Sequence, residues 1–510
     1  MIRNKRSRAF KILLWTLGII ILLGGIAQLL FGQMVQRALE DEVPENIKLT
    51  YGKLSTNVLL GRIRLHNVSL HALNGGIDFK SPSVTASGLR YARLLRTGDL
   101  EFSRLELLEP KVNYRSPKKE TSAPRIKKRG QKNIAIETLS ISEGQLQLFE
   151  EESNCPDLSI QNIDIRLDGV CINGETRSLD LPFSFDGHQL STGEGSWDLG
   201  ALETLQWQKI HLDSLSGLVQ DLKFHTKFSK EELSKRLAVE NDHYELEVDS
   251  IFLRRPDLGP GRIHMEQMNL FSPNFQVYRD KLLPDDTTHK KLFNRLLRDL
   301  GPDLQVDTVF ISGGSLSYTE RLEVGINPEK LLFTDISAKI ANLHNRGCGK
   351  VQLDIGAELM GDGPLGLDWS FDPWNKSNDF LIKGSLSNFD TRNISPFLRS
   401  NLSAEVEGGI DRLYFTISGN EMESRGDLKM AYGEFGFVVL KKDRSGVNRF
   451  LTALVNLFAK DGNKADADGF RHGHFTVERK RDRSFFNYLW LNIKEGLVAS
   501  MTGNGNKQND

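Results

Sequence analysis

Two short segments carry residue types that enzyme chemistry uses. Residues Gly361 to Gly366 have GxGxxG spacing, but a dinucleotide site needs those glycines to open a helix after a strand. Pro364 and the Gly-Leu-Asp-Trp that follows oppose a helix, so the segment predicts a glycine-rich hairpin turn. His472 and His474 could present two imidazoles on one side of a strand, yet no Asp, Glu or Cys cluster beside them completes a metal shell.

The remaining composition also argues against catalysis. The chain contains no nucleophile elbow, Walker loop or HExxH sequence, so we expect a protein that is not an enzyme and that has no cofactor and no metal site. Its 66 basic and 67 acidic residues give a formal net charge of -1, so no nucleic-acid partner is expected. Cys155, Cys171 and Cys348 show no CxxC spacing, which argues against a disulfide framework or zinc site.

An apolar segment near the N-terminus, Ile12 to Phe31, is long enough to cross a membrane. It contains no charge and only Thr16 and Gln28 as polar side chains, and as a helix it spans ~30 Å, the thickness of a bilayer's hydrocarbon core. Basic residues precede it and mostly acidic residues follow it. Since basic flanks stay in the cytoplasm, the segment predicts a single-pass anchor with the bulk of the chain outside the cytoplasm.

A cleaved signal peptide is the alternative for this segment, because Gly25-Ile26-Ala27 loosely fits a small-x-small cleavage site. The apolar run continues through Leu29, Leu30 and Phe31, whereas an apolar signal region has about 7 to 15 residues. Its length therefore favours a retained anchor.

Past the anchor, apolar and polar residues alternate in short runs that Gly, Asn, Asp or Pro interrupt. This pattern is typical of half-buried β-strands. In Arg62 to Leu70, Ile63 and Leu65 have one parity and Val68 and Leu70 have the other, which predicts a β-bulge within the strand.

One pair of segments occurs twice in the same order. LELLEPKVNY (Leu105 to Tyr114) matches MNLFSPNFQV (Met268 to Val277), and IETLSISEGQLQL (Ile136 to Leu148) matches VDTVFISGGSLSY (Val306 to Tyr318). Such a repetition indicates stacked supersecondary units that share one extended core. The Ser-x-Gly of the second segment predicts a strand, a tight turn and another strand.

The segments between and after these repeats have other patterns. Arg115 to Lys132 contains eight basic residues, two prolines and one acid; it predicts a flexible linker, with contact to anionic headgroups as the alternative. The corresponding segment of the second copy, Asp285 to Leu300, predicts a helix. Its apolar residues recur at helical spacing: Leu292, Phe293, Leu296, Leu297 and Leu300. Two C-terminal helices are expected, Val447 to Phe458 and Ser484 to Met501. The second should cap the sheet, and lying on a membrane is its alternative.

The chain resembles the AsmA-like family of Gram-negative envelope proteins on three features. These are the basic N-terminus with one anchor, the LxLxxPxVxY and IxxLxIxxGxLxL units at Leu105 to Leu148 and Met268 to Tyr318, and the closing segments KGSLSNFD, GGIDRLYFTISG and GDLKMAYGEFGF. The resemblance covers most of the chain and transfers no single functional residue. It implies a long, curved antiparallel sheet lined with apolar side chains, related to eukaryotic bridge-like lipid transfer proteins, and a place in phospholipid movement to, and homeostasis of, the outer membrane.

The expected fold is therefore mainly β, with one N-terminal transmembrane helix, an elongated, curved antiparallel β-sheet shaped like a groove, internal repeats and a few amphipathic helices. The expected segments are a cytoplasmic N-terminus (1–11), the anchor (12–31), a first β unit (34–114), the basic loop (115–132), a second β unit (133–280), a helical insertion (281–302), an AsmA-like C-terminal β region (303–440), and C-terminal helices and tail (441–510). The resemblance implies a bacterial inner-membrane protein whose bulk lies in the periplasm.

Lipid binding is the function that this resemblance implies. Carrying a two-chain lipid through water exposes acyl chains at about 0.8 kcal/mol per CH₂, on the order of 20 kcal/mol altogether, and an apolar groove removes that cost. The candidate lining residues share apolar side chains in the repeated strands: Leu105, Leu107, Val112, Ile136, Leu139, Ile141, Leu146, Met268, Phe275, Val309, Ile311 and Leu316.

Two alternatives stay open for these residues. They could form an ordinary sheet core under helices or a second sheet, with no lipid involved. The sheet could instead serve a scaffold or assembly factor for outer-membrane proteins, binding client strands by edge pairing, with envelope proteins as its partners. An open trough with an uncovered apolar face favours phospholipid or another acyl lipid, whereas a closed sandwich with a polar edge favours protein clients.

Overall fold

The computed structural model describes residues 24–37, 39, 47–72, 76–115, 133–150, 153–176, 182–259, 261–402, 404–439 and 468–502. These residues are mainly β-strand, as the alternation of apolar and polar side chains predicts. The chain forms two compact units. Unit 1 comprises Met1–Asp198 and Gln208–Ser214, and unit 2 comprises Leu199–Trp207 and Leu215–Asp510.

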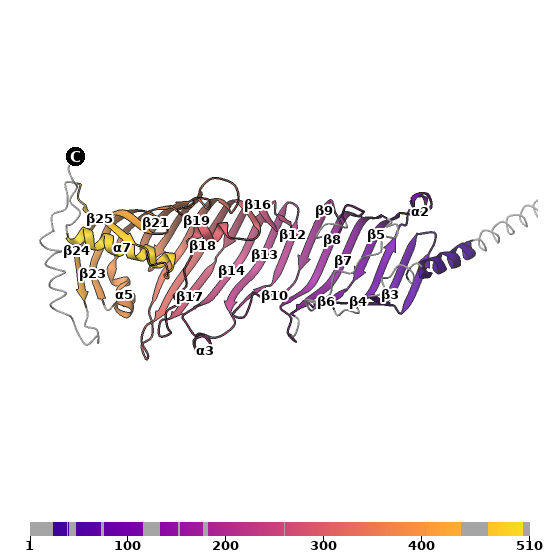
Figure 1. Cartoon of the computed structure of the whole chain (residues 1–510), viewed down its shortest axis with the longest axis horizontal. Helices are drawn as coiled ribbons and strands as arrows, with labels where there is room; N and C mark the ends of the chain where they lie inside the picture. Colours follow the sequence, from indigo (N-terminus) through magenta and orange to yellow (C-terminus); the bar gives the residue numbers. More distant parts are fainter. Residues whose placement is uncertain are drawn as a thin grey trace, which may run out of the picture. The chain divides into compact units, whose positions relative to one another are not determined.

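Unit 1 is built on one β-sheet (Figure 1). Neighbouring strands follow the order β3, β4, β5 with β6, β7, β8, β9 and β12. A helix over residues 24–37 and α2 (Tyr91–Thr97) lie at one end of it. Its strands are β1 (Ile47–Thr50), β2 (Lys53–Asn57), β3 (Arg62–Ala72), β4 (Ile77–Ser87), β5 (Leu100–Leu108), β6 (Lys111–Arg115), β7 (Ile134–Phe149), β8 (Leu158–Ile172), β9 (Gly187–Thr192), β10 (Gly195–Asp198) and β12 (Lys209–Asp213).

Unit 2 is also built on a sheet, with neighbours in the order β11, β13, β14, β16 with β17, and then β18 to β25 in sequence. Its strands are β11 (Glu203–Trp207), β13 (Ser216–Thr226), β14 (Asp242–Arg254), β15 (Asp257–Gly259), β16 (Arg262–Phe271), β17 (Asn274–Asp280), β18 (Asp303–Arg321), β19 (Lys330–His344), β20 (Val351–Leu359), β21 (Gly363–Phe371), β22 (Phe380–Asp390), β23 (Ala404–Gly419), β24 (Glu423–Val439) and β25 (Arg471–Glu478). Its helices are α3 (Lys230–Arg236), α4 (Phe293–Arg298), η2 (Thr391–Asn393), α5 (Ser395–Leu402) and α7 (Phe485–Thr502).

The sheets are mixed, so the prediction of a purely antiparallel sheet is wrong. β5 and β6 pair with β7 in parallel, and β16 and β17 pair with β18 in parallel. Parallel neighbours need a crossover connection of a dozen or more residues. Residues 116–133 and 281–302 supply these crossovers, and α4 lies in the second. The predicted basic loop and helical insertion therefore occupy equivalent places in the two repeats.

The Ser-x-Gly segments are not tight turns, so that prediction is also wrong. β7 and β18 each continue through the segment as one strand, with positive φ at Glu143 and Gly313. The register with the following strand shifts beside Gly144 and Gly314, as in a β-bulge. A two-residue hairpin turn and a bulge of this kind both use a residue with positive φ, so the local sequence did not distinguish them.

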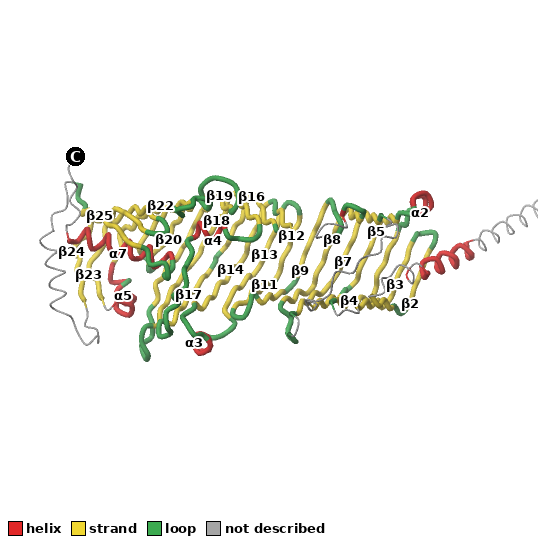
Figure 2. Tube along the Cα trace, in the orientation of Figure 1, coloured by secondary structure: helices red, strands yellow, loops and turns green. Residues whose placement is uncertain are grey.

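Figure 2 shows the strands of each unit as long, regularly spaced segments. Within each unit, the bulges of neighbouring strands lie at one level. The positive-φ residues at this level are Asn67, Glu109, Glu143 and Asn162 in unit 1, and Asp221, Ser272, Gly313 and Asp335 in unit 2. Asn67 is the bulge predicted between Leu65 and Val68. Because a bulge bends its strand, each line of bulges bends the successive strands of its unit at the same level.

The repeated Pro and Gly positions meet at these bulges. A Cβ on Gly144 would lie 3.3 Å from Cγ of Pro110, and a Cβ on Gly314 would lie 3.3 Å from Cγ of Pro273. The neighbouring backbone is also the same, since Gln145 N donates to Pro110 O and Ser315 N donates to Pro273 O. The repetition in the sequence therefore marks a common packing arrangement.

Among the described residues, no helix is long and apolar enough to cross a membrane. Residues 12–23 of the predicted anchor lie outside the described part of the chain, and residues 24–31 belong to the helix over 24–37. The anchor therefore stays a prediction. The predicted helix Val447 to Phe458 and the linker residues 116–132 also lie outside the described residues.

The final helix agrees with its prediction. α7 runs from Phe485 to Thr502 and packs on β24 and β25, with Phe485 and Tyr488 buried. The predicted helix at 292–300 is shorter: α4 covers Phe293–Arg298, and Leu296 and Leu300 are exposed.

Candidate functional site

One apolar row crosses unit 1 from strand to strand, and we call it the Leu54 row. Each member is the direct partner of the next in the β-ladder: Leu54, Leu65, Val84, Leu107, Ile141, Ile165, Leu190 and Leu212. Every member is half-buried. Strands lie about 4.8 Å apart, so the row extends for roughly 34 Å.

A second row lies beyond the line of bulges in unit 1. Its members are Leu49, Leu70, Phe79, Val112, Leu146 and Ile160, and all are half-buried. The bulges change the parity of each strand between the two rows, so Ile141, Gly144 and Leu146 of β7 share one face. The opposite face carries polar pairs, such as Thr138 Oγ1 donating to Asp168 Oδ1 at 3.1 Å.

Unit 2 repeats this arrangement in the Leu205 row. Its members, again direct partners in the ladder, are Leu205, Phe224, Leu246, Phe275, Leu316, Phe333 and Leu359. A parallel row contains Val219, Ile251, Leu270, Ile311, Ala338, Ile355 and Leu367. All members of the Leu205 row are half-buried.

The structure brings most of the predicted lining residues together in pairs. In unit 1 the pairs are Leu105 with Leu139, Leu107 with Ile141, and Val112 with Leu146. In unit 2 they are Met268 with Val309 and Phe275 with Leu316, while Ile311 faces Leu270.

The remaining candidate, Ile136, lies opposite Phe102 and Val170. It is only 6% exposed, and Val309 is only 4% exposed. These two candidates are core residues, whereas the other ten are half-buried.

Sequence reasoning missed the strands that continue the rows on either side of the repeats. Val84, Leu190 and Leu212 belong to the Leu54 row, and Phe224 and Phe333 belong to the Leu205 row. Their alternation in the sequence was visible, but their register against the repeated strands depends on long-range pairing.

The C-terminal part of unit 2 contrasts with these rows because its apolar face is covered. α7 and Leu292 pack against a fully buried cluster drawn from β20 to β25: Val351, Phe371, Phe380, Ile382, Leu413, Phe415, Ile417, Leu428, Met430, Phe475 and Val477. Asn492 of α7 is buried there, where its Oδ1 accepts from Ser424 Oγ at 2.7 Å and its Nδ2 donates to Tyr488 O at 2.8 Å. A covered face therefore gives full burial in this protein, whereas the members of the Leu54 and Leu205 rows are half-buried, including the end members Leu54 and Leu359 that pack against buried clusters.

Polar groups border the Leu205 row at the Asp242 end of β14. Arg279 donates two 2.6 Å hydrogen bonds to Asp242, and Tyr244 OH donates to the same carboxylate at 3.1 Å. Burial opposes the charge on Arg279, but the hydrogen bonds to Asp242 raise its pKa overall. Burial and the neighbouring Glu320 carboxylate raise the pKa of Tyr318. These groups stay in their ordinary charge states, so they form a fixed polar border.

The two motifs with catalytic residue types have structural explanations. Gly361 lies in the turn between β20 and β21, where Leu359 pairs with Gly363, so the predicted hairpin is confirmed. His472 contacts Asp468 at 3.0 Å, and His474 contacts Asp427. Within the described ranges, no three His, Cys, Asp or Glu side chains lie close enough to hold a metal ion.

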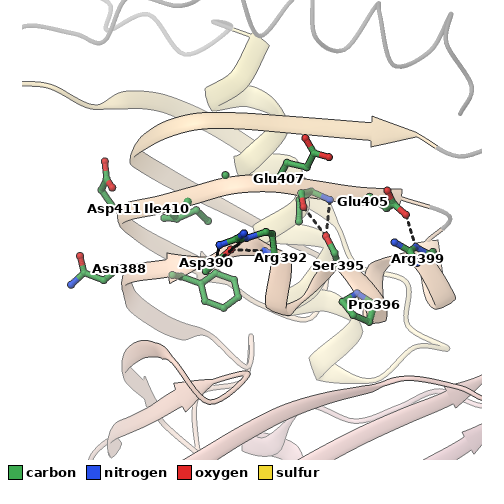
Figure 3. Close-up of a pocket in the computed structure, with 14 residues that line it drawn as sticks. Asn388, Asp390, Arg392, Ser395, Pro396, Arg399, Glu405, Glu407, Ile410 and Asp411 are labelled. Atoms are coloured by element: carbon green, nitrogen blue, oxygen red, sulfur yellow. Dashed lines mark hydrogen bonds and ion pairs between the residues drawn. The ribbon is translucent and has the colours of Figure 1, made fainter.

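A polar hollow of about 760 Å³ lies beside α5 in unit 2 (Figure 3). Four of its charged groups form two ion pairs, Arg392 with Asp390 and Arg399 with Glu405, and Glu407 and Asp411 also line the hollow. Ser395 Oγ donates to Val406 O at 2.7 Å and accepts from Val406 N at 3.0 Å. These side chains hold α5 against β23 and present no nucleophile and base in contact.

No protein-family model and no curated protein matches this chain.

Proposed function

We propose that this protein is a non-enzymatic, AsmA-like envelope protein that binds the acyl chains of phospholipid or a similar lipid along the apolar faces of its sheets. In this proposal Ile12 to Phe31 anchors the chain in a bacterial inner membrane, with the N-terminus cytoplasmic and the bulk periplasmic. The protein would support phospholipid transport to the outer membrane, or homeostasis of that membrane, without a cofactor, metal or nucleic acid.

The observation that carries the proposal is the half-burial of the Leu54 and Leu205 rows. Each row is apolar at every strand that it crosses, whereas the face beneath α7 is fully buried. An acyl chain is about 15 Å long in a bilayer leaflet, and the Leu54 row extends for roughly 34 Å. One row is therefore long enough to lie against a complete acyl chain.

The same observation supports lipid over protein clients. Client strands would bind an exposed polar edge through backbone hydrogen bonds, and half-burial of a broad apolar face is not needed for that. Acyl chains would remove this face from water, at about 25 cal/mol per Å² of apolar area buried.

Site-specific photo-crosslinking in a Gram-negative host tests the proposal. A photoreactive phenylalanine analogue at Leu107, Ile141 or Phe275 should crosslink to phospholipid, because these side chains belong to the Leu54 and Leu205 rows. The matched controls are Glu106 and Gln276, the next residues on the same strands, whose side chains point to the opposite face. Equal lipid labelling on both faces, or none on either face of a folded chain, would contradict the proposal.

A further inference from the structure

The end of unit 1 that carries the helix over residues 24–37 has a polar clamp. Gln28 Nε2 donates to Thr56 Oγ1 at 2.9 Å and to Thr56 O, and Gln28 Oε1 accepts from Val58 N at 2.8 Å. Thr56 and Val58 lie at the end of β2 and in the turn that leads to β3. Gln28 is one of two polar side chains in the predicted anchor, and all of its amide atoms are used here.

Apolar packing fixes the same contact. Phe31 and Val35 of the helix are buried with Leu89. The ring of Tyr91, the first residue of α2, lies edge-on to Phe31 with centroids 6.0 Å apart, and its hydroxyl donates to Val58 O at 2.6 Å. The helix, the turn at 58–61 and α2 therefore form one packed body.

This packing sets the depth of the turn relative to the predicted anchor. Gln28 precedes Phe31, the last residue of the anchor, by three positions, or ~4.5 Å along a helix axis. A turn that hydrogen-bonds to Gln28 must lie at the depth of Gln28. That depth is within the interfacial zone that amphipathic segments occupy, about 5–10 Å into the headgroup and acyl boundary.

The side chains at this end are apolar and exposed. Leu59 and Leu60 of the turn are 90% and 54% exposed, and Leu95 of α2 is 84% exposed. Leu29 and Leu30 of the helix are also exposed. Clusters of exposed large apolar side chains mark interaction sites for membranes or proteins, and this cluster continues directly from the predicted anchor.

Basic residues flank the exposed leucines. Arg62 follows the turn and Arg96 follows Leu95, and neither forms an ion pair with any described residue. Arg90 and Arg93 differ, because both pair with Glu101. An unpaired guanidinium next to an exposed leucine suits a lipid phosphate above an acyl chain, at about 1 kcal/mol per basic residue near an anionic surface.

We infer that this end of unit 1 is seated in the membrane surface, with Leu59, Leu60 and Leu95 inserted between lipids and with Arg62 and Arg96 on anionic headgroup phosphates. The inference rests on the anchor of the proposed function and adds a second membrane contact to it. Leu54, the first member of the Leu54 row, packs against the Phe31 cluster. The row therefore begins at the seated end, where lipid enters it from the bilayer.

Fluorescence quenching in vesicles tests this seat. The full chain, with Cys155, Cys171 and Cys348 replaced by Ser, receives one cysteine at Leu59, Leu60 or Leu95 and an environment-sensitive label. The control site is Val324, an apolar residue of unit 2 that is 78% exposed. In vesicles of phosphatidylethanolamine and phosphatidylglycerol, lipids with a nitroxide near the headgroup should quench the three test sites and leave Val324 bright.

The same quenching assay tests whether membrane contact depends on Arg62, Arg96 and anionic lipid. The Arg62→Glu, Arg96→Glu double variant should lose much of the quenching at Leu59 and Leu95, and vesicles without phosphatidylglycerol should reduce it in the unaltered chain. Quenching that is equal at Leu59 and Val324 overturns the seat, and quenching that ignores both changes overturns the phosphate contacts.

The outcomes separate this inference from the proposed function. Quenching at Leu59 without lipid crosslinks at Leu107 supports the seat and refutes lipid binding along the row. Crosslinks at Leu107 without quenching at Leu59 refute the seat alone. A chain that does not float with the vesicles refutes the anchor, and the seat with it.

Discussion

Shortening one leucine in the Leu205 row and one beneath α7 should cost unequal amounts of folding free energy. Leu428 is 1% exposed in the cluster under α7, so Leu428→Ala should destabilise the protein by about 3 kcal/mol, within the usual range for a core cavity. Leu246 is half-buried between Phe224 and Phe275. The space left by Leu246→Ala opens to solvent and adds no sealed cavity, so we expect a cost of about 1 kcal/mol.

Bound lipid should change the loss of folding free energy for only one of these two substitutions. Acyl chains against the Leu205 row would complete the burial of Leu246, and the cost of Leu246→Ala should rise to about 2 kcal/mol in the loaded protein. The cost of Leu428→Ala should stay the same, because α7 already excludes solvent there. Both residues lie in unit 2, so one unfolding transition reports on both.

Urea unfolding followed by tryptophan fluorescence measures these differences, using a chain that begins at Gly24 and keeps every described residue. Each variant is compared with the unaltered chain in delipidated and phospholipid-loaded form. A cost near 3 kcal/mol for Leu246→Ala without lipid would mean that the row is covered, and a cost that lipid leaves unchanged would refute acyl contact at this position.

Two other substitutions test the bulge and a buried imidazole. Gly144→Ala should destabilise unit 1 by about 1–2 kcal/mol, because the new Cβ would lie 3.2 Å from Ile163 O and 3.3 Å from Pro110 Cγ. The control is Gly174→Ala, whose new Cβ would have no atom within 4 Å. Equal urea midpoints for the two variants would contradict the reasoning. Burial lowers the pKa of His243 in the folded state, despite the nearby Glu245, so the unfolded chain binds more protons below about pH 6.5. The stability of unit 2 should therefore fall as the pH drops through that value and toward the folded pKa. His243→Phe should flatten this dependence in urea titrations, and an unchanged slope would show that another group is responsible.

The strands and their faces could be predicted because they depend on local alternation. The repeated strands predict Leu105, Leu107 and Leu139 as lining residues of an apolar face, and the ladder places Leu105 directly opposite Leu139. The match of Pro110 with Pro273 and of Gly144 with Gly314 was visible in the sequence and corresponds to the same contact in both units. Short-range pattern was sufficient for these features.

Pairing direction and helix docking could not be predicted in this way. A left-handed residue at Glu143 fits a hairpin turn as well as a bulge. The bulge forms because Glu109 N donates a hydrogen bond to Ser142 O, and these two residues are far apart in the sequence. The contact between Gln28 and Val58 is equally long-range. Gln28 is one of two polar residues in an apolar run, and nothing in the local sequence indicates its partner.

The lines of bulges have a consequence for how faithfully these sheets assemble. Alternation alone penalises slippage by one residue, which reverses the two faces, but it tolerates slippage by two. A two-residue slip would move Glu143 and Gly144 away from Glu109 and Pro110 and would place the extra residue of one strand against a regular stretch of the other. The bulges therefore fix the register of each strand pair. A long sheet of similar strands can then add each new strand in its correct register.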